Sequence, residues 1–129
     1  MLGPMDAAQA IADLTEISPQ IREVAIIGAD GSLVGSNAPE TAAARLATAA
    51  ARLVEEAERL RPDIAQLEAA TVNGSVFVVR DGGRLIAATT SPEPTVGLVF
   101  YDLKTCLRSV EPPAPKRRRA PARKASDAS

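Results

Sequence analysis

The longest periodic stretch of the chain is residues 37–61, NAPETAAARLATAAARLVEEAERLR. Leu46, Leu53 and Leu60 recur every seven residues and alanines fill the same stripe, which is the spacing of an amphipathic helix. Pro62 ends the pattern, because the residue before a proline disfavours helical geometry. The stretch therefore predicts one long helix, and the small residues of its stripe would let another backbone approach closely.

The start of this helix carries a recognisable signal. Asn37 lies three residues before Glu40, with Pro39 between them. An asparagine followed by a proline in the first turn and an acidic residue at the third position is the pattern of a capping box. We therefore expect the side chain of Asn37 to cap the helix.

After the long helix the apolar period changes to two. Residues 64–71 alternate apolar and polar side chains, which predicts a strand with one polar face. Asn73-Gly74 is a strong hairpin signal, because both residues tolerate a positive φ. Residues 75–80 and 85–88 are apolar on both faces and are separated by an Asp-Gly-Gly turn. Three consecutive strands should form a meander, with residues 64–71 at an edge.

Two further helices and a hairpin complete the pattern. Residues 6–16 predict a short helix capped by Asp6, and residues 24–27 and 33–34 predict a buried strand and a brief edge strand. Residues 96–110 carry apolar side chains at three- and four-residue steps, which favours a last helix. A sixth strand over residues 96–101 is the alternative. Gly97 should lie where another group packs closely, since glycine destabilises a helix interior.

These elements follow the order α-β-β-α-β-β-β-α. The strands that begin at residues 24, 75 and 85 are apolar on both sides, so helices should cover both faces of the sheet. The predicted fold class is therefore α/β (α+β), a three-layer sandwich with a five-stranded antiparallel sheet.

The composition excludes most enzyme classes. Histidine and tryptophan are absent and Cys106 is the only thiol, which excludes a disulfide framework, a His/Cys metal cluster and a His-based triad within one chain. Gly28, Gly31 and Gly35 are interpreted as turn glycines, because no Lys-Ser/Thr pair and no helix start follow them. Cys106 is expected in the core, next to Leu107. We expect no catalytic residue, no cofactor and no metal.

The charge is divided unevenly along the chain. Residues 1–110 hold 9 basic and 14 acidic side chains, whereas residues 111–129 hold 6 and 2, with four prolines and no large apolar residue. This composition predicts a disordered basic tail of Pro, Ala and Arg. Its basic residues are Lys116, Arg117, Arg118, Arg119, Arg123 and Lys124. No apolar run approaches the roughly 20 residues of a membrane span, and residues 1–10 hold no basic residue, so a cytoplasmic protein without a signal peptide is expected.

The order and spacing of these elements resemble the Roadblock (dynein light chain) domain family, which includes bacterial regulators of Ras-like GTPases. The resemblance covers about residues 5–110 and depends on three segments. They are residues 24–31 (VAIIGADG), the Ala/Leu-rich long helix, and residues 95–98 (TVGL), which open the last helix. The chain is thus divided into a Roadblock-like domain at residues 1–110 and the tail at residues 111–129.

The resemblance implies a profilin-like sheet and a homodimer that pairs through the long helix and the strand after it. The edge strand beside a helix with small residues agrees with that expectation. The implied interface residues are Leu46, Ala49, Ala50, Leu53, Ala57, Leu67 and Glu68.

The resulting functional hypothesis is a non-enzymatic homodimer that binds and regulates, or scaffolds, a small Ras-like GTPase. In the family, such proteins can raise GTP hydrolysis by rearranging the switch residues of the GTPase. The predicted GTPase-binding residues are the charged positions of the long helix, Arg45, Arg52, Glu55, Glu56 and Arg59. The acidic ones are interpreted as solvated and ion-paired.

Two other functions stay open at this point. The basic tail could tether the dimer to DNA, RNA or an anionic membrane through phosphate contacts, because no aromatic residue interleaves its charges for base stacking. A small-ligand sensor is the third hypothesis, although few polar groups occupy buried positions where they could orient a ligand.

Overall fold

The computed structural model describes residues 5–110. The elements are α1 (Ala7–Ile17), β1 (Ile21–Ile27), β2 (Leu33–Ser36), α2 (Glu40–Leu60), β3 (Gln66–Thr71), β4 (Gly74–Asp81), β5 (Arg84–Thr90) and α3 (Val96–Ser109). This is the predicted order of helices and strands. The alternative of a sixth strand over residues 96–101 is wrong, because α3 occupies that segment. The basic tail predicted at residues 111–129 lies outside the described residues.

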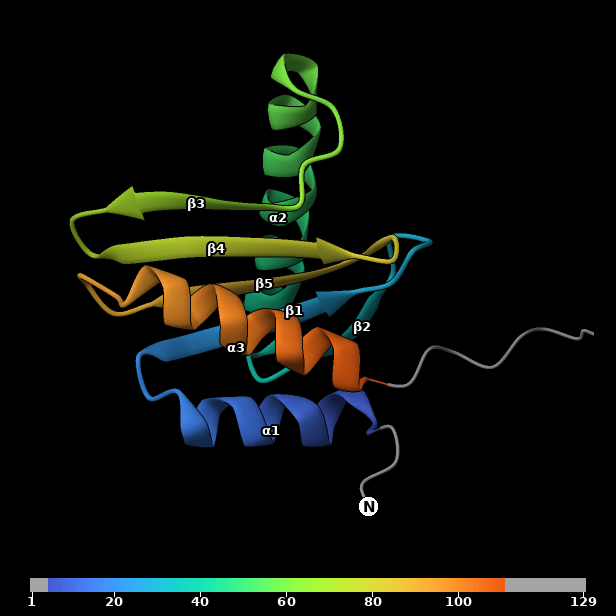
Figure 1. The fold of residues 1–129 in the computed structure, drawn as a ribbon. Coiled ribbons are helices and arrows are strands. Elements are labelled where there is room, and N and C mark those ends of the chain that lie inside the picture. The colour runs from blue at the N-terminus through green and yellow to red at the C-terminus, as the bar shows by residue number, and fades with distance from the viewer. Residues whose placement is uncertain (1–4, 111–129) are drawn as a thin grey trace, which may run out of the picture.

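The five strands form one antiparallel sheet in the order β2-β1-β5-β4-β3. The predicted inner strands β1, β4 and β5 lie in the middle, and the two strands with polar character lie at the edges. Helix α2 covers one face of the sheet, and α1 and α3 lie side by side on the other (Figure 1). The predicted three-layer sandwich is confirmed.

Alternating side chains of the inner strands divide the core into two layers. On β1, Val24 and Ile26 pack toward α1 and α3, whereas Ala25 and Ile27 pack toward α2. The ring of Phe77 contacts that of Phe100 edge to face, with centroids 4.9 Å apart. Burial on both faces is the reason why these strands contain continuous apolar runs rather than alternating ones.

The capping box predicted at the start of α2 is wrong. The N-cap residue is Pro39, and no side chain caps the helix. Asn37 is used by the sheet instead: its Oδ1 accepts a hydrogen bond from Val24 N at 2.8 Å, and its Nδ2 donates to Arg22 O at 2.8 Å. At the start of α1 the prediction is confirmed, since the side chain of Asp6 accepts from Gln9 N.

The hairpin between β3 and β4 forms as predicted, but its loop lies one residue earlier. Thr71 pairs with Gly74, so the loop residues are Val72 and Asn73. Gly74 opens β4 with a φ of 136°. The turn between β4 and β5 agrees with its Gly-Gly sequence, because Gly82 and Gly83 both have positive φ.

The expectation that a group packs closely on Gly97 is also wrong. A Cβ built at Gly97 would have no atom within 4 Å, and the residue is exposed in the first turn of α3. Among the described residues, no helix is both long enough and apolar enough to span a membrane.

Replacing Gly97 by alanine is therefore expected to stabilise the fold by up to about 1 kcal/mol, since alanine restricts the unfolded chain more than glycine does. Denaturant unfolding would measure the change. The matched control is Gly31→Ala, which also adds a methyl group in open space but at a φ of +87°. That variant should lose about 1 kcal/mol. A destabilised Gly97→Ala variant would contradict the prediction.

Candidate functional site

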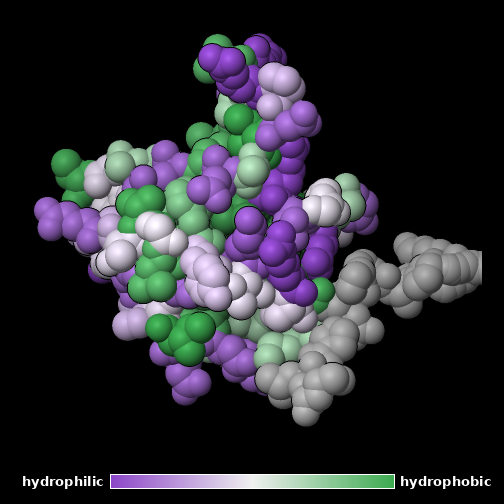
Figure 2. Space-filling model, viewed as in Figure 1, coloured by the Kyte–Doolittle hydropathy of each residue, from purple (hydrophilic) through white to green (hydrophobic). Residues whose placement is uncertain are grey.

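Helix α2 is longer than the sheet beneath it is wide. Its C-terminal end projects past β3 (Figure 1), and hydrophobic and hydrophilic residues both cover that end (Figure 2). The last buried residue of the helix is Val54, whereas Leu60 at its end is 83% exposed. The projecting turns thus have apolar surface that the chain's own sheet does not cover.

Strand β3 lies directly beside this projecting end and forms one edge of the sheet. It pairs with β4 alone, so its outer row of N–H and C=O groups has no strand partner within the described residues. An exposed edge of this kind is a template for pairing with a further strand. Leu67 and Ala69 are half-buried on the side toward α2, whereas Gln66 and Glu68 are exposed.

An open groove of about 510 Å³ separates the projecting helix from the edge strand. Its lining residues are Leu53, Glu56, Ala57, Arg59, Leu60, Leu67, Glu68 and Ala69. Apolar side chains form much of the groove, and charged ones stand within it. Exposed apolar surface that is accompanied by polar residues is typical of a protein–protein contact.

The predicted interface residues divide into two groups. Leu46 and Ala50 are 7% and 0% exposed, because they pack against the sheet of the same chain. Little of either side chain is left to contact a second copy, so these two residues are core residues. The other residues remain accessible on α2 and β3. They are Ala49, Leu53, Ala57, Leu67 and Glu68.

The predicted GTPase-binding residues all lie on the exposed part of α2. They are Arg45, Arg52, Glu55, Glu56 and Arg59. Their spacing places them on one charged side of the helix, next to the groove. Two of them, Glu56 and Arg59, also line the groove, and their side chains lie 3.8 Å apart as an exposed ion pair. The two predicted surfaces therefore meet at these residues.

An ion pair that the sequence analysis missed attaches the end of α2 to the sheet. Arg80 Nη1 of β4 lies 2.6 Å from Glu58 Oε2, and about a third of each side chain is exposed. In the sequence, the only signal was a charged residue directly after the apolar run of residues 76–79. This contact links the C-terminal part of α2 to β4, the strand next to the edge strand β3.

Gly28 and Gly31 lie in the turn between β1 and β2, as the sequence indicated. The interpretation of Gly35 as a turn glycine is wrong: it lies in β2, pairs with Ile26, and a Cβ there would lie 2.7 Å from Ala7 Cβ. Gly31 has a φ of +87°, and Asp30 Oδ1 accepts hydrogen bonds from the backbone N and the Oγ of Ser32. A phosphate would meet this carboxylate rather than free N–H donors. Within residues 5–110, no group of three or more His, Cys, Asp or Glu side chains could hold a metal ion.

Comparison with known proteins finds matches in structure but none in sequence. No protein-family model matches the chain, and no curated protein matches it in sequence. Among solved structures, a Roadblock/LC7 domain from Streptomyces avermitilis has a TM-score of 0.71 and 17% identity over 81% of this chain and 94% of that one. The chain has the Roadblock/LC7 fold.

Two other structures extend this result. MglB from Myxococcus xanthus matches with a TM-score of 0.61 and 15% identity, over 80% of this chain and 89% of that one. LokiProfilin1, solved in complex with rabbit actin, matches with a TM-score of 0.58 and 17% identity, over 82% and 96%. The predicted profilin-like character of the Roadblock/LC7 fold is confirmed by the last match. At these identities the likeness concerns the fold.

Proposed function

We propose that the chain is a non-enzymatic regulator of a small Ras-like GTPase and that it acts as a homodimer. The observation that carries the proposal is the free edge of β3 beside the projecting end of α2, within a Roadblock/LC7 fold. Among the solved structures with this fold is MglB from Myxococcus xanthus. The resemblance of the sequence to the Roadblock family implies the same role.

The dimer would use two kinds of contact at once. Two β3 edges could pair as antiparallel strands around a two-fold axis, which would satisfy the outer backbone groups of both. Each projecting helix would then lie near the partner's edge strand, where Leu53, Leu60 and Leu67 offer apolar surface. Ala49 and Ala57, with small side chains, would let the backbones approach.

The GTPase would bind the charged side of the paired helices. Arg45, Arg52 and Glu55 are exposed and lie outside the groove, so they stay accessible when β3 and the groove are covered. Glu56 and Arg59 lie at the boundary of the two surfaces, and a GTPase bound there would contact both protomers. A regulator of this kind would act through binding energy, by favouring one arrangement of the partner's switch segments.

The proposal is tested by sedimentation of the purified chain and by GTP turnover of the GTPase with and without it. A dimer that changes turnover, or that binds the GTP and GDP forms with different affinity, is the expected result. A chain that stays monomeric at high concentration would overturn the dimer. A dimer that binds neither nucleotide form would overturn the GTPase role and leave the dimer intact.

We expect Arg52→Glu to weaken GTPase binding by about tenfold, since a reversed charge at an interface rim costs on the order of 1–2 kcal/mol. Arg52 is exposed and has no ion-pair partner within residues 5–110, so the fold and the dimer should be unchanged. Arg22→Glu is the matched control, because Arg22 is an exposed arginine on β1. Equal binding by both variants, measured by calorimetry, would remove this surface from the proposal.

A second candidate function rests on the composition of the tail. Six basic residues among nine positions, 116–124, would attract an anionic polymer or membrane. In this alternative the dimer is a tether that presents two basic tails. Deleting residues 112–129 should abolish salt-sensitive binding to DNA, RNA or anionic vesicles and leave GTPase regulation unchanged.

A further inference from the structure

A second groove lies between α1 and α3, on the face of the sheet opposite α2. Its volume is about 280 Å³, and apolar side chains form most of its walls. Met5 and Ser109 line one end of the groove. Ile17, the last residue of α1, lines the other end. Between them stand two acidic residues, Asp13 of α1 and Asp102 of α3. Among the described residues, neither a lysine nor an arginine lines the groove.

Within residues 5–110, the carboxylates of this groove have no cationic partner. Asp102 is only 8% exposed, and within residues 5–110 its carboxylate has neither a hydrogen bond nor an ion pair. Asp13 accepts a single hydrogen bond, from Gln9 Nε2 at 2.9 Å. Among the described residues, the buried side-chain oxygen without a hydrogen bond is Ser18 Oγ, so the Asp102 oxygens are open to solvent in the groove. A ligand that carries cationic donors would satisfy both carboxylates.

The neighbouring thiol of Cys106 is buried beside the same groove. Burial, with the charge of Asp13 as a second cause, raises the pKa of Cys106 to about 12. Cys106 Sγ lies 3.5 Å from Ala10 O, between the two helices. The groove along α3 thus combines mostly apolar walls with two acidic side chains.

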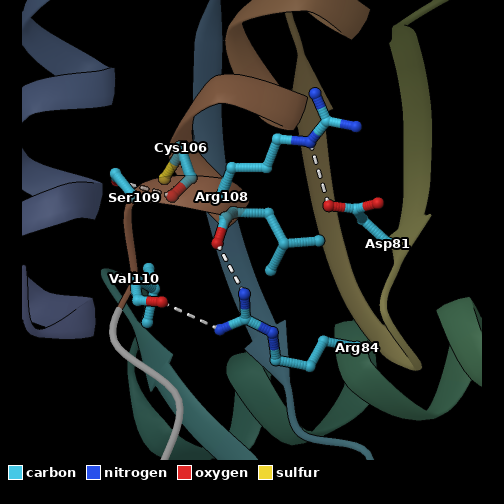
Figure 3. A network of polar contacts seen from close by, with 7 residues as sticks. Asp81, Arg84, Cys106, Arg108, Ser109 and Val110 are labelled. Carbon is cyan, nitrogen blue, oxygen red and sulfur yellow. Dashed lines mark hydrogen bonds and ion pairs between the residues drawn. The ribbon is translucent and has the colours of Figure 1, made fainter. Parts of the chain in front are cut away.

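The chain leaves the described structure at one end of this groove. The guanidinium of Arg84 donates to Val110 O at 3.1 Å and to Leu107 O at 3.0 Å, and Arg108 Nε lies 3.0 Å from Asp81 Oδ2 (Figure 3). Met5 N donates to Ser109 O at 2.9 Å. These contacts fix residue 110, which is 3% exposed, next to the end of the groove lined by Met5 and Ser109.

The segment that follows has the charge and the reach to enter the groove. Its first basic residue comes six positions after Val110, which spans up to about 20 Å in an extended chain. Along α3, the eight residues back from Val110 to Asp102 span only about 12 Å. The six basic residues of the segment complement the acidic excess of residues 1–110.

We propose that residues 116–124 of the same chain bind in the groove between α1 and α3, where their ammonium and guanidinium groups donate to Asp13 and Asp102. The tail then has a built-in partner on the domain itself. Any anionic polymer would have to compete with that partner for the same basic residues. The contact does not depend on the proposed GTPase regulation, because it lies on the other face of the sheet.

Limited trypsin digestion of the full chain, followed by mass spectrometry, tests this contact at the Lys and Arg residues of the tail. At low salt, cleavage after residues 116–119 should be about fivefold faster in the double variant Asp13→Asn, Asp102→Asn than in the unmodified chain. High salt, about 1 M, should remove the difference. Asp63→Asn is the matched control, because Asp63 is an exposed aspartate in the loop after α2, and it should cleave like the unmodified chain.

A second variant keeps the domain unchanged. Replacing Lys116, Arg117, Arg118 and Arg119 with glutamine should speed hydrogen exchange at the groove side of α1 and α3. Equal tail cleavage in the unmodified chain and the double variant would overturn the proposal. Protection that rises with protein concentration would assign the bound tail to a second copy. Protection that appears only with added anionic vesicles or DNA would assign it to those polymers instead of the groove.

Discussion

Replacing Gly74 by alanine is expected to destabilise the fold by about 4 kcal/mol or more, which is at the extreme of single substitutions. An added Cβ would lie 2.0 Å from the carbonyl oxygen of Thr90, and the φ of +136° is one that side chains rarely allow. The backbone cannot easily move away, since Ser75 N donates to Thr90 Oγ1 at 3.2 Å. Chemical denaturation followed by circular dichroism would measure the loss.

Gly82→Ala is the control that separates the cost of a positive φ from the cost of a steric clash with the added Cβ. Gly82 also has a positive φ, +61°, but a Cβ there would meet nothing within 4 Å. Its replacement should cost only the 1–2 kcal/mol or so of a left-handed backbone. Equal costs for the two variants would show that the steric argument at Gly74 is wrong. Because β3 leads into this hairpin and Thr71 pairs with Gly74, the Gly74 variant should also weaken any contact made through that edge.

The second large effect is expected from Leu60→Glu. Leu60 is 83% exposed and lines the groove beside β3, so the single chain loses almost no packing when it is replaced. In the proposed dimer, the new carboxylate would be buried against the apolar side chains of the groove. We expect the dissociation constant of the dimer to rise by about a hundredfold, since such a charge costs on the order of 3 kcal/mol. Sedimentation over a concentration series would measure it.

Ile17→Glu provides the comparison. Ile17 is 67% exposed at the end of α1, on the face of the sheet opposite α2. The Ile17 variant therefore also replaces an exposed aliphatic side chain with a charged one. It should leave the dimer unaffected. Loss of GTPase binding in the Leu60 variant alone would connect regulation to the paired helices. An undisturbed dimer in that variant would place the interface elsewhere on the surface.

The sheet could be predicted from the sequence because burial leaves a strong pattern. Strands covered on both faces are continuously apolar, as at Val24–Ile27 and Val76–Val79, whereas the edge strands alternate or are short. The apolar spacing of the three helices around the sheet was equally visible. These signals are local: whether a position is buried or exposed decides whether its side chain is apolar or polar, and that can be read directly from the sequence.

Other features depend on partners distant in the sequence and were therefore missed. Asn37 has the chemistry of a helix cap, but a strand thirteen residues earlier offers it two hydrogen bonds. Asn73-Gly74 fits a hairpin loop, yet the close approach of Thr90 requires the glycine to begin the strand itself. Asp102 lies three residues after Val99 and four before Cys106, both buried, and a carboxylate on that stripe was the one signal of the acidic groove.

The β-bridge between Met5 and Val110 makes the domain suitable for circular permutation. Both described ends emerge at a single corner, far from β3 (Figure 1). A short linker could join them, with new ends opened at the exposed turn around Gly31, and such a circularly permuted chain should keep its architecture. A fluorescent label attached next to residue 5 or residue 110 would report on assembly without covering the β3 edge.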